Sequence, residues 1–240
     1  MSDPWLSIVG LGEDGADGLT PATLKTLKEA EIIMGPARHL ALLPDVDAER
    51  VEWPVPFADG IEVLKAHRGR NTVALVSGDP FWYGAGSVFA RHFEPTEWRA
   101  FPATSVFSHA VAEMGWPLET TLCIGLHAAP LERLRPHLAP DQRAIVLLRD
   151  GENVTALRSY LCEAGFGDTE MTVMEAIGGP RQKITKLTAA TKINKGQTFS
   201  HPVCAALNIK GDGAILTLAT GRDDDVFDHD GQITKRPVRA

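Results

Sequence analysis

Two stretches, Gly10-Leu11-Gly12-Glu13-Asp14-Gly15 and Ser77-Gly78-Asp79-Pro80-Phe81-Trp82-Tyr83-Gly84, each follow a short apolar run, at residues 5–9 and 72–76. Continuous apolar runs of this length predict buried strands. In open α/β sheets, ligands bind beyond the carboxyl ends of the strands, where the strand order reverses. We therefore expect both stretches to be loops at one edge of a sheet and to converge on a single crevice.

Strand and helix patterns alternate through the first half of the chain. Thr20-Pro21 is typical of a helix start, with threonine as the N-cap and proline at the first helical position. The alternation predicts an α/β fold with a mostly parallel sheet. Further helices are expected at 36–43, 60–67, 85–92 and 105–114, and further strands at 31–34, 50–53 and 99–101.

The second half has more strand relative to helix, which predicts a mixed sheet. Strands are expected at 121–124, 144–148, 170–176, 203–209 and 214–218, and helices near 131–137 and at 152–164, the last ended by Gly165. A break at residues 115–118 is the candidate hinge. We expect an N-terminal α/β domain at 1–116, a C-terminal α/β domain at 117–221 and a flexible, aspartate-rich linker tail at 222–240.

Composition excludes several classes of protein. The 240 residues carry a net charge of −7, which argues against nucleic acid as the main partner. The 3 cysteines form no CxxC pair, and the histidines lack metal-ligand spacing, so we expect reduced thiols and no metal. No signal peptide or long apolar stretch is evident, which predicts a cytoplasmic protein that does not enter the membrane.

The first loop matches the dinucleotide pattern G-x-G-x-x-G, but the match is weak by itself. In a dinucleotide site the third glycine lies in the opening helix, whereas here the helix signal comes later, at Thr20-Pro21. Glu13, Asp14 and Asp17 would also repel a pyrophosphate. Three interpretations stay open at this point: a dinucleotide site, a flexible turn, and a loop shaped for a neutral or cationic ligand.

Three segments together resemble a known family. IVGLGEDGADGLT at 8–20, VSGDPFWYG at 76–84 and FPATSVFSHAVAEMGWPLE at 101–119 are similar, in order and spacing, to the tetrapyrrole (corrin/porphyrin) methyltransferases. MGPARHL at 34–40, CIGLHAAP at 123–130 and HDGQITKRPVRA at 229–240 most resemble the N-terminal, C5-methylating half of the fused, decarboxylating precorrin-6y C5,15-methyltransferases. The resemblance covers nearly the whole chain.

The resemblance implies a two-domain tetrapyrrole methylase fold with the cofactor cleft between the domains, usually in a homodimer. The implied cofactor is S-adenosyl-L-methionine, which leaves as S-adenosylhomocysteine. Its implied contacts, largely through the main chain, are Gly12, Gly78, Asp79, Trp82, Ser105, Val106, Leu148 and Ala176. The sequence departs from the family in the first loop, where Glu13 replaces the usual proline and Asp14 the next glycine.

The implied substrate is a polycarboxylate tetrapyrrole, a late precorrin of the precorrin-6/7 stage methylated at ring carbon C5 in cobalamin biosynthesis. Candidate substrate-binding residues are Arg38, His39, His109, His127 and Arg149. The family's arginine after His127 is absent, since Ala128 and Ala129 follow. A covalently attached C-terminal methyltransferase/decarboxylase half is implied as a partner.

No catalytic residue is assigned, because methyl transfer from a sulfonium needs no protein nucleophile. The alternatives are an earlier-stage methyltransferase of the uroporphyrinogen or precorrin-2 type, an NAD-dependent oxidoreductase, and a non-catalytic half that only binds ligand or its partner domain.

Overall fold

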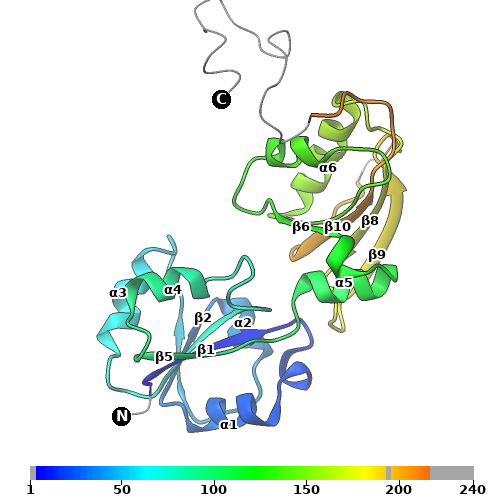
Figure 1. Ribbon diagram of the computed structural model, residues 1–240. Helices are drawn as coiled ribbons and strands as arrows, with labels where there is room; N and C mark the ends of the chain where they lie inside the picture. The colour runs from blue at the N-terminus through cyan, green and yellow to red at the C-terminus, as the bar shows by residue number, and fades with distance from the viewer. Residues whose placement is uncertain (1–3, 193–195, 217–240) are drawn as a thin grey trace, which may run out of the picture.

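The computed structural model describes residues 4–192 and 196–216. Its strands form two five-stranded sheets, one built before residue 102 and the other after residue 121 (Figure 1). The expected fold class, α/β with one parallel and one mixed sheet, is confirmed.

The first sheet has the order β3-β2-β4-β1-β5, and every neighbouring pair is parallel. The three inner strands, β2, β4 and β1, are almost wholly buried, which is why their sequences are mostly apolar. The strands are β1 (Leu6–Leu11), β2 (Ile32–Gly35), β3 (Glu49–Glu52), β4 (Thr72–Ser77) and β5 (Trp98–Phe101).

Helices cover both faces of this sheet (Figure 1). Alternate residues of β1 face opposite sides of the sheet. Ile8 belongs to a buried apolar cluster with residues of α3 (Asp59–Ala66) and α4 (Gly86–His92). Val9, on the other face, belongs to a cluster with residues of α1 (Pro21–Glu29). The predicted start of α1 is confirmed, because Thr20 accepts a hydrogen bond from the Thr23 amide at 3.2 Å. The remaining elements here are η1 (Gly15–Gly18) and α2 (Ala37–Leu42).

The sheet order places the two glycine-containing loops together. From β1 the chain continues to β2, on the far side of β4, whereas from β4 it continues to β5, on the far side of β1. Leu11 and Ser77, the last residues of β1 and β4, are paired in the ladder. The loops at 12–15 and 78–84 therefore leave the same sheet edge in opposite directions, as the sequence predicted.

The second sheet has the order β6-β7-β10-β8-β9, in which only β6 and β7 are parallel. One face carries α6 (Gly151–Glu163) and the other α5 (Val106–Met114). The remaining elements are η2 (Leu118–Thr120), β6 (Leu122–Gly125), η3 (Leu131–His137), β7 (Arg143–Leu148), β8 (Glu170–Glu175), β9 (Lys183–Thr188) and β10 (Val203–Asn208).

Three details differ from the sequence predictions. The prediction of a strand at 214–218 is wrong for residues 214–216, which form no strand. The chain just before them is held at the end of α6, because the amides of Asp212 and Gly213 donate to the Gly165 carbonyl. Residues 217 and 218 lie outside the described residues, as does the expected tail at 222–240. The helix near 131–137 is a 3-10 helix with Pro136 inside it, and the edge strand β9 was not predicted.

The packing of α5 bears on the domain boundary. Phe107, Ala110 and Val111 on this helix share a buried cluster with Ile145, Met174, Cys204 and Ala206 of the second sheet. We therefore propose that the second domain begins at α5, near residue 105, rather than at residue 117.

Candidate functional site

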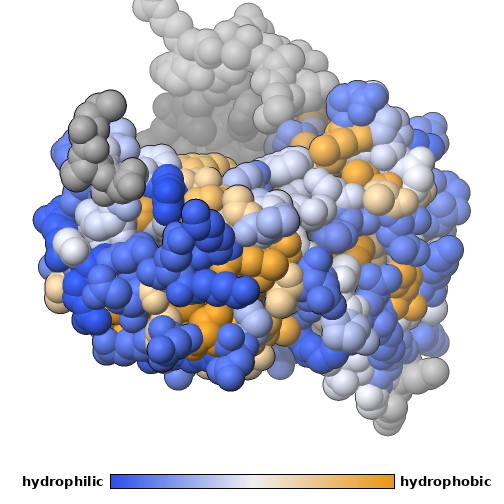
Figure 2. Space-filling model, turned by 90° about the horizontal axis from the view of Figure 1, so that it is seen from below, coloured by the Kyte–Doolittle hydropathy of each residue, from blue (hydrophilic) through white to orange (hydrophobic). Residues whose placement is uncertain are grey.

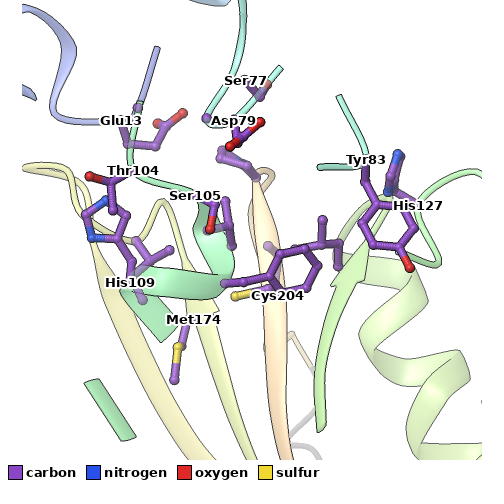
Figure 3. Close-up of a pocket in the computed structure, with 18 of the residues that line it drawn as sticks. Glu13, Ser77, Asp79, Tyr83, Thr104, Ser105, His109, His127, Met174 and Cys204 are labelled. Atoms are coloured by element: carbon purple, nitrogen blue, oxygen red, sulfur yellow. The ribbon is translucent and has the colours of Figure 1, made fainter. Parts of the chain in front are cut away.

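A cavity of about 210 Å³ lies where the loops of the first sheet meet the second sheet (Figure 3). The first sheet contributes the ends of β1 and β4 and their loops, and the segment after β5 leads to the start of α5. Residues at the ends of β7, β8 and β10 close the other side, among them Leu148, Met174 and Cys204. The site is thus assembled from chain segments that are distant in the sequence.

Beside the lining residues Leu11 and Gly78, main chain packs closely on main chain. A Cβ atom added at Gly10 would lie 1.9 Å from the Gly78 carbonyl oxygen and 2.7 Å from the Ala103 nitrogen, so only glycine fits there. Gly78 has a φ of +54°, which favours glycine. Its amide donates to the Leu11 carbonyl at 3.1 Å, and its carbonyl accepts from Ala103 at 3.2 Å. These bonds fix three loops at one point, where a ligand can approach the backbone closely.

The N-terminus of α5 forms the next part of the wall. The Ser105 hydroxyl caps the helix by accepting from the Ser108 amide at 3.1 Å. The first helical residues, Val106 and Phe107, line the cavity. Because the first amides of a helix lack partners within the helix and carry partial positive charge, this end favours a hydrogen-bond acceptor or an anionic group.

The second loop brings a carboxylate and two aromatic rings. Asp79 Oδ1 accepts from the Phe81 amide at 2.8 Å, which shapes the turn. The ring of Trp82 lies 4.7 Å from that of Phe107, and both are apolar surfaces of the cavity. Tyr83 has a φ of 57°, an uncommon value for a bulky residue, and its ring occupies the space in front of Gly125.

Glu13 is the most enclosed charged group at the cavity. Its side chain is 7% exposed, and one carboxylate oxygen, Oε1, pairs with the Arg38 guanidinium. The other oxygen, Oε2, accepts from Arg181 at 2.7 Å. From the sequence, Glu13 is a charge that disfavours phosphate and a departure from the family loop; the structure shows that it pairs with two arginines.

His39 supports Arg38 from behind. Its Nε2 lies 2.8 Å from Arg38 Nη2 and 3.1 Å from the Ser77 hydroxyl. Burial, followed by the charge of Arg38, lowers the pKa of His39 from 6.5 to about 4. The imidazole is therefore neutral at physiological pH and can accept the hydrogen bond that the guanidinium donates. Burial and the charge of Arg181 also lower the pKa of Arg38.

Two more histidines, His127 and His201, line the cavity, and His127 lies on the opposite side from Glu13 in Figure 3. His127 is beside Tyr83 (Figure 3), and burial, followed by the proximity of His201, lowers its pKa. His201 Nδ1 lies 2.9 Å from the Arg149 carbonyl oxygen. Across the part of the chain that the structure describes, His, Cys, Asp and Glu side chains form no group of three that could hold a metal ion.

The structure brings most of the predicted site residues together. Of the predicted cofactor contacts, seven line the cavity: Gly12, Gly78, Asp79, Trp82, Ser105, Val106 and Leu148. Of the predicted substrate contacts, Arg38, His109 and His127 line it.

Three predicted residues stand outside the cavity wall. Ala176 lies just before the lining residue Ile177, and its amide donates to the Pro202 carbonyl at 2.8 Å. His39 is buried behind Arg38. Arg149 is an exposed side chain that pairs with Asp150 at 3.0 Å.

Glu13, Thr104, Met174, His201 and Cys204 line the cavity but were not among the site residues predicted from the sequence. The departure of Glu13 from the family pattern was a signal that could have found it. The others follow from tertiary packing alone.

The model of the tetrapyrrole (corrin/porphyrin) methylases matches residues 6–192 of the chain. The chain belongs to this family. As a tetrapyrrole methylase, it is 40% identical over 239 residues to a precorrin-6Y C(5,15)-methyltransferase (decarboxylating) of Sinorhizobium sp, covering 99% of this chain and 58% of that relative. It is 33% identical over 182 residues to the cobalt-precorrin-7 C(5)-methyltransferase of Salmonella typhimurium, covering 75% of this chain and 88% of that protein.

Solved structures of other members share the fold of this tetrapyrrole methylase. A uroporphyrin-III C-methyl transferase from Thermus thermophilus, complexed with S-adenosylhomocysteine, has a TM-score of 0.68 at 18% identity and covers 85% of this chain and 96% of its own. A precorrin-6Y methylase from Archaeoglobus fulgidus has a TM-score of 0.62 at 20% identity, with 86% and 98% covered. The expected family and fold are thereby confirmed.

The dinucleotide interpretation of the first loop loses its structural basis in this tetrapyrrole methylase. Gly15 lies in η1 with a φ of 59°, and α1 begins only at Pro21. The third glycine therefore begins a four-residue 3-10 helix and not the α-helix whose N-terminus would receive a pyrophosphate. None of the helices within the described ranges is long and apolar enough to cross a membrane.

Proposed function

We propose that this chain transfers a methyl group from S-adenosyl-L-methionine to ring carbon C5 of a late precorrin in cobalamin biosynthesis. The observation that carries the proposal is the single cavity on which the loops after β1 and β4 and the N-terminus of α5 converge. Family membership and the 40% identity to a precorrin-6Y C(5,15)-methyltransferase support the choice of reaction.

The residues of the cavity fit this cofactor. The apolar surfaces of Trp82 and Phe107 suit a flat nucleoside, and the lining glycines Gly12 and Gly78 leave room for it to approach the backbone. The Asp79 carboxylate suits a cationic group, whereas the N-terminus of α5 suits a carboxylate. When bound, S-adenosyl-L-methionine supplies a methyl group on a positively charged sulfur.

The chain's own contribution is to position, to exclude water and to balance charge. In-line attack requires the ring carbon about 3–3.5 Å from the methyl carbon. The apolar walls formed by Leu148, Met174 and Val203 keep water from the cofactor side. Half-buried Arg38 and His127 line the cavity and offer polar contacts to the carboxylates of the substrate.

Binding of S-adenosylhomocysteine tests the proposed cofactor. Titration calorimetry should detect binding, and saturating ligand should raise the Tm by about 5 °C or more. NAD should do neither. Binding of NAD with no binding of S-adenosylhomocysteine would remove the methyltransferase assignment.

Methyl transfer tests the proposed substrate. With labelled S-adenosyl-L-methionine, a late precorrin should gain one methyl group, located at C5 by NMR. Uroporphyrinogen III is the matched control for an earlier-stage enzyme. Methylation of uroporphyrinogen III and not of the late precorrin would replace the proposed step by an earlier one.

We extend the proposal to the assembly of the protein. The chain spans 58% of the length of the first curated relatives it matches, which supports a covalently attached methyltransferase/decarboxylase half in the full protein. Family resemblance further supports a homodimer located in the cytoplasm. Light scattering on the purified chain tests the dimer, and a monomeric mass at micromolar concentration would contradict it.

A further inference from the structure

We propose that Glu13 is a positioning residue whose buried carboxylate holds Arg38 and Arg181, from opposite sides of the cleft, so that the two guanidiniums bind one carboxylate of the ligand. This inference deepens the proposed function and rests on it. Its starting observation is that each Glu13 oxygen pairs with a different arginine, Oε1 with Arg38 and Oε2 with Arg181.

The two arginines belong to different parts of the fold. Arg38 lies in the first turn of α2 in the first domain, whereas Arg181 lies in the turn between β8 and β9 of the second sheet. That turn is ordered by its own bonds, since Gln182 Oε1 accepts from the Gly178 amide at 2.8 Å. It also lies against the first loop: a Cβ at Gly179 would be 2.5 Å from the Glu13 carbonyl oxygen. Glu13 thus joins the two sides of the cleft.

The charges do not cancel within this group. One carboxylate faces two guanidiniums, so the three side chains carry a net charge of +1. Arg38 is held by neutral His39 and by Ser77, which add no charge. A buried carboxylate with two arginines is therefore a positive site fixed in place. A carboxylate from the ligand would restore neutrality, and guanidiniums bind carboxylates with directional, charge-assisted hydrogen bonds.

Exposure and neighbouring charges indicate where the carboxylate binds. The side chains of Arg38 and Arg181 are 28% and 58% exposed, so both can reach a ligand, whereas Glu13 at 7% cannot. Beyond Glu13 a separate hollow is lined by Asp14 and Asp17, whose charges repel an anion. The main cavity has one further carboxylate, Asp79, and is the less negative of the two sides. The ligand carboxylate is therefore expected beside Arg38, at the edge of the main cavity, where the exposed Arg181 can also reach it.

Two ligands of the proposed reaction carry carboxylates: the tetrapyrrole at its periphery and the cofactor at its amino-acid end. Arg181 lies outside the cavity wall and is mostly exposed, which favours the tetrapyrrole. The α5 N-terminus is the better site for the cofactor carboxylate.

Binding titrations separate these sources without requiring turnover. The probes are a stable corrin polycarboxylate, the same corrin with its carboxylates amidated, and S-adenosylhomocysteine. Arg38→Gln and Arg181→Gln should each lower the affinity for the polycarboxylate by about tenfold or more. The affinities for the amidated corrin and for S-adenosylhomocysteine should stay within about twofold of those of the unaltered chain. Arg181→Lys should recover part of the loss. Lys186→Gln, which removes an equal charge from exposed β9, is the matched control and should change none of them.

Glu13→Gln distinguishes positioning from charge. If the group acted by net charge alone, removing the carboxylate would raise its charge to +2 and strengthen polycarboxylate binding. Positioning predicts the opposite, a loss of about tenfold, because the guanidiniums are no longer held. Retained binding of S-adenosylhomocysteine verifies that Glu13→Gln is folded. If Glu13→Gln does not fold, the two arginine variants still test whether the ligand carboxylate binds here.

Several results would overturn the inference. Polycarboxylate binding unchanged in both arginine variants would remove the site, and tighter binding by Glu13→Gln would remove the positioning role. An equal loss for the amidated corrin would show that no carboxylate is recognised. A loss of affinity confined to S-adenosylhomocysteine would show that the arginines bind the carboxylate of the cofactor and not one of the substrate. Failure of S-adenosylhomocysteine to bind the unaltered chain would instead refute the proposed function.

Discussion

Asp79 has two roles to separate at the residue scale: it shapes its own turn, and it places a negative charge at the cavity. Asp79→Asn keeps an acceptor for the Phe81 amide and removes the charge. We expect Asp79→Asn to lower the affinity for S-adenosylhomocysteine about tenfold in a calorimetric titration, because a charged hydrogen bond to the ligand is lost. Asp150→Asn, which alters a helix N-cap outside the cavity, is the control and should leave this affinity unchanged. Equal affinity for both variants would assign Asp79 to the turn alone.

The buried His39 predicts a pH dependence of stability. Its pKa is lowered from 6.5 to about 4 in the folded chain, so the unfolded chain binds the proton more readily. The stabilisation is present above pH 6.5 and is lost as the pH falls to about 4. It amounts to about 3 kcal/mol, since each pKa unit corresponds to about 1.4 kcal/mol.

Urea unfolding at pH 7 and pH 4.5 measures this term. The unaltered chain should lose more free energy of unfolding between these pH values than His39→Gln does. Carboxylates titrate in both proteins, so the difference between them isolates the imidazole. Parallel losses in the two proteins would show that His39 is not the group responsible.

The close packing of Gly10 against neighbouring backbone predicts a large steric effect. A methyl group at Gly10 would collide with the backbone of both Gly78 and Ala103, which have no flexible side chain to move. Gly10→Ala should therefore lower the free energy of unfolding by about 3 kcal/mol or more. Gly69→Ala is the control, because open space surrounds that position; its positive φ should cost only about 1 kcal/mol. Comparable losses of the free energy of unfolding in the two variants, measured with denaturant, would contradict the close packing of Gly10 against the neighbouring backbone.

At the element scale, α1 and α5 form a matched pair of capped helices. Thr20 and Ser105 each accept a bond from the amide three residues later, at 3.2 and 3.1 Å, but only Ser105 lines the cavity. Thr20→Ala and Ser105→Ala should each cost about 1 kcal/mol of stability. Only Ser105→Ala should also weaken S-adenosylhomocysteine binding, by severalfold. Loss of affinity in both variants would indicate a general loosening of the fold.

The sequence was sufficient for elements whose local signals agree with the tertiary fold. The buried run at β4 and the Thr20-Pro21 start of α1 are examples. It was insufficient where long-range packing decides. β9 pairs at the sheet edge with its polar side chains exposed, so it has no continuous apolar run. Arg181 meets Glu13 only because β8 and β9 return the chain to the first loop, and no spacing in the sequence predicts that contact.

At the scale of the whole molecule, most of the visible surface in Figure 2 is hydrophilic, with smaller groups of hydrophobic residues between. This is consistent with buried apolar clusters around both sheets. The first sheet and its helices have clusters of their own, and the second sheet shares one with α5. We infer from these clusters that each half has a core of its own.

The proposed boundary near residue 105 follows from this division. A fragment of residues 105–216 should fold with a cooperative thermal transition, because α5 covers Ile145, Met174 and Cys204. A fragment of residues 117–216 should aggregate or melt without cooperativity, since that apolar face is uncovered. Circular dichroism during heating compares the two. A shorter fragment as stable as the longer one would restore the boundary to residue 117.

The meeting point of Gly10, Gly78 and Ala103 limits how ligand preference can change during evolution. Main-chain carbonyls belong to every residue and main-chain N–H donors to every residue except proline, so few point mutations delete them. Added bulk at Gly10 breaks the fold first. Adaptation to another substrate must therefore act through side chains that line the cavity, such as Arg38, Tyr83 or His127.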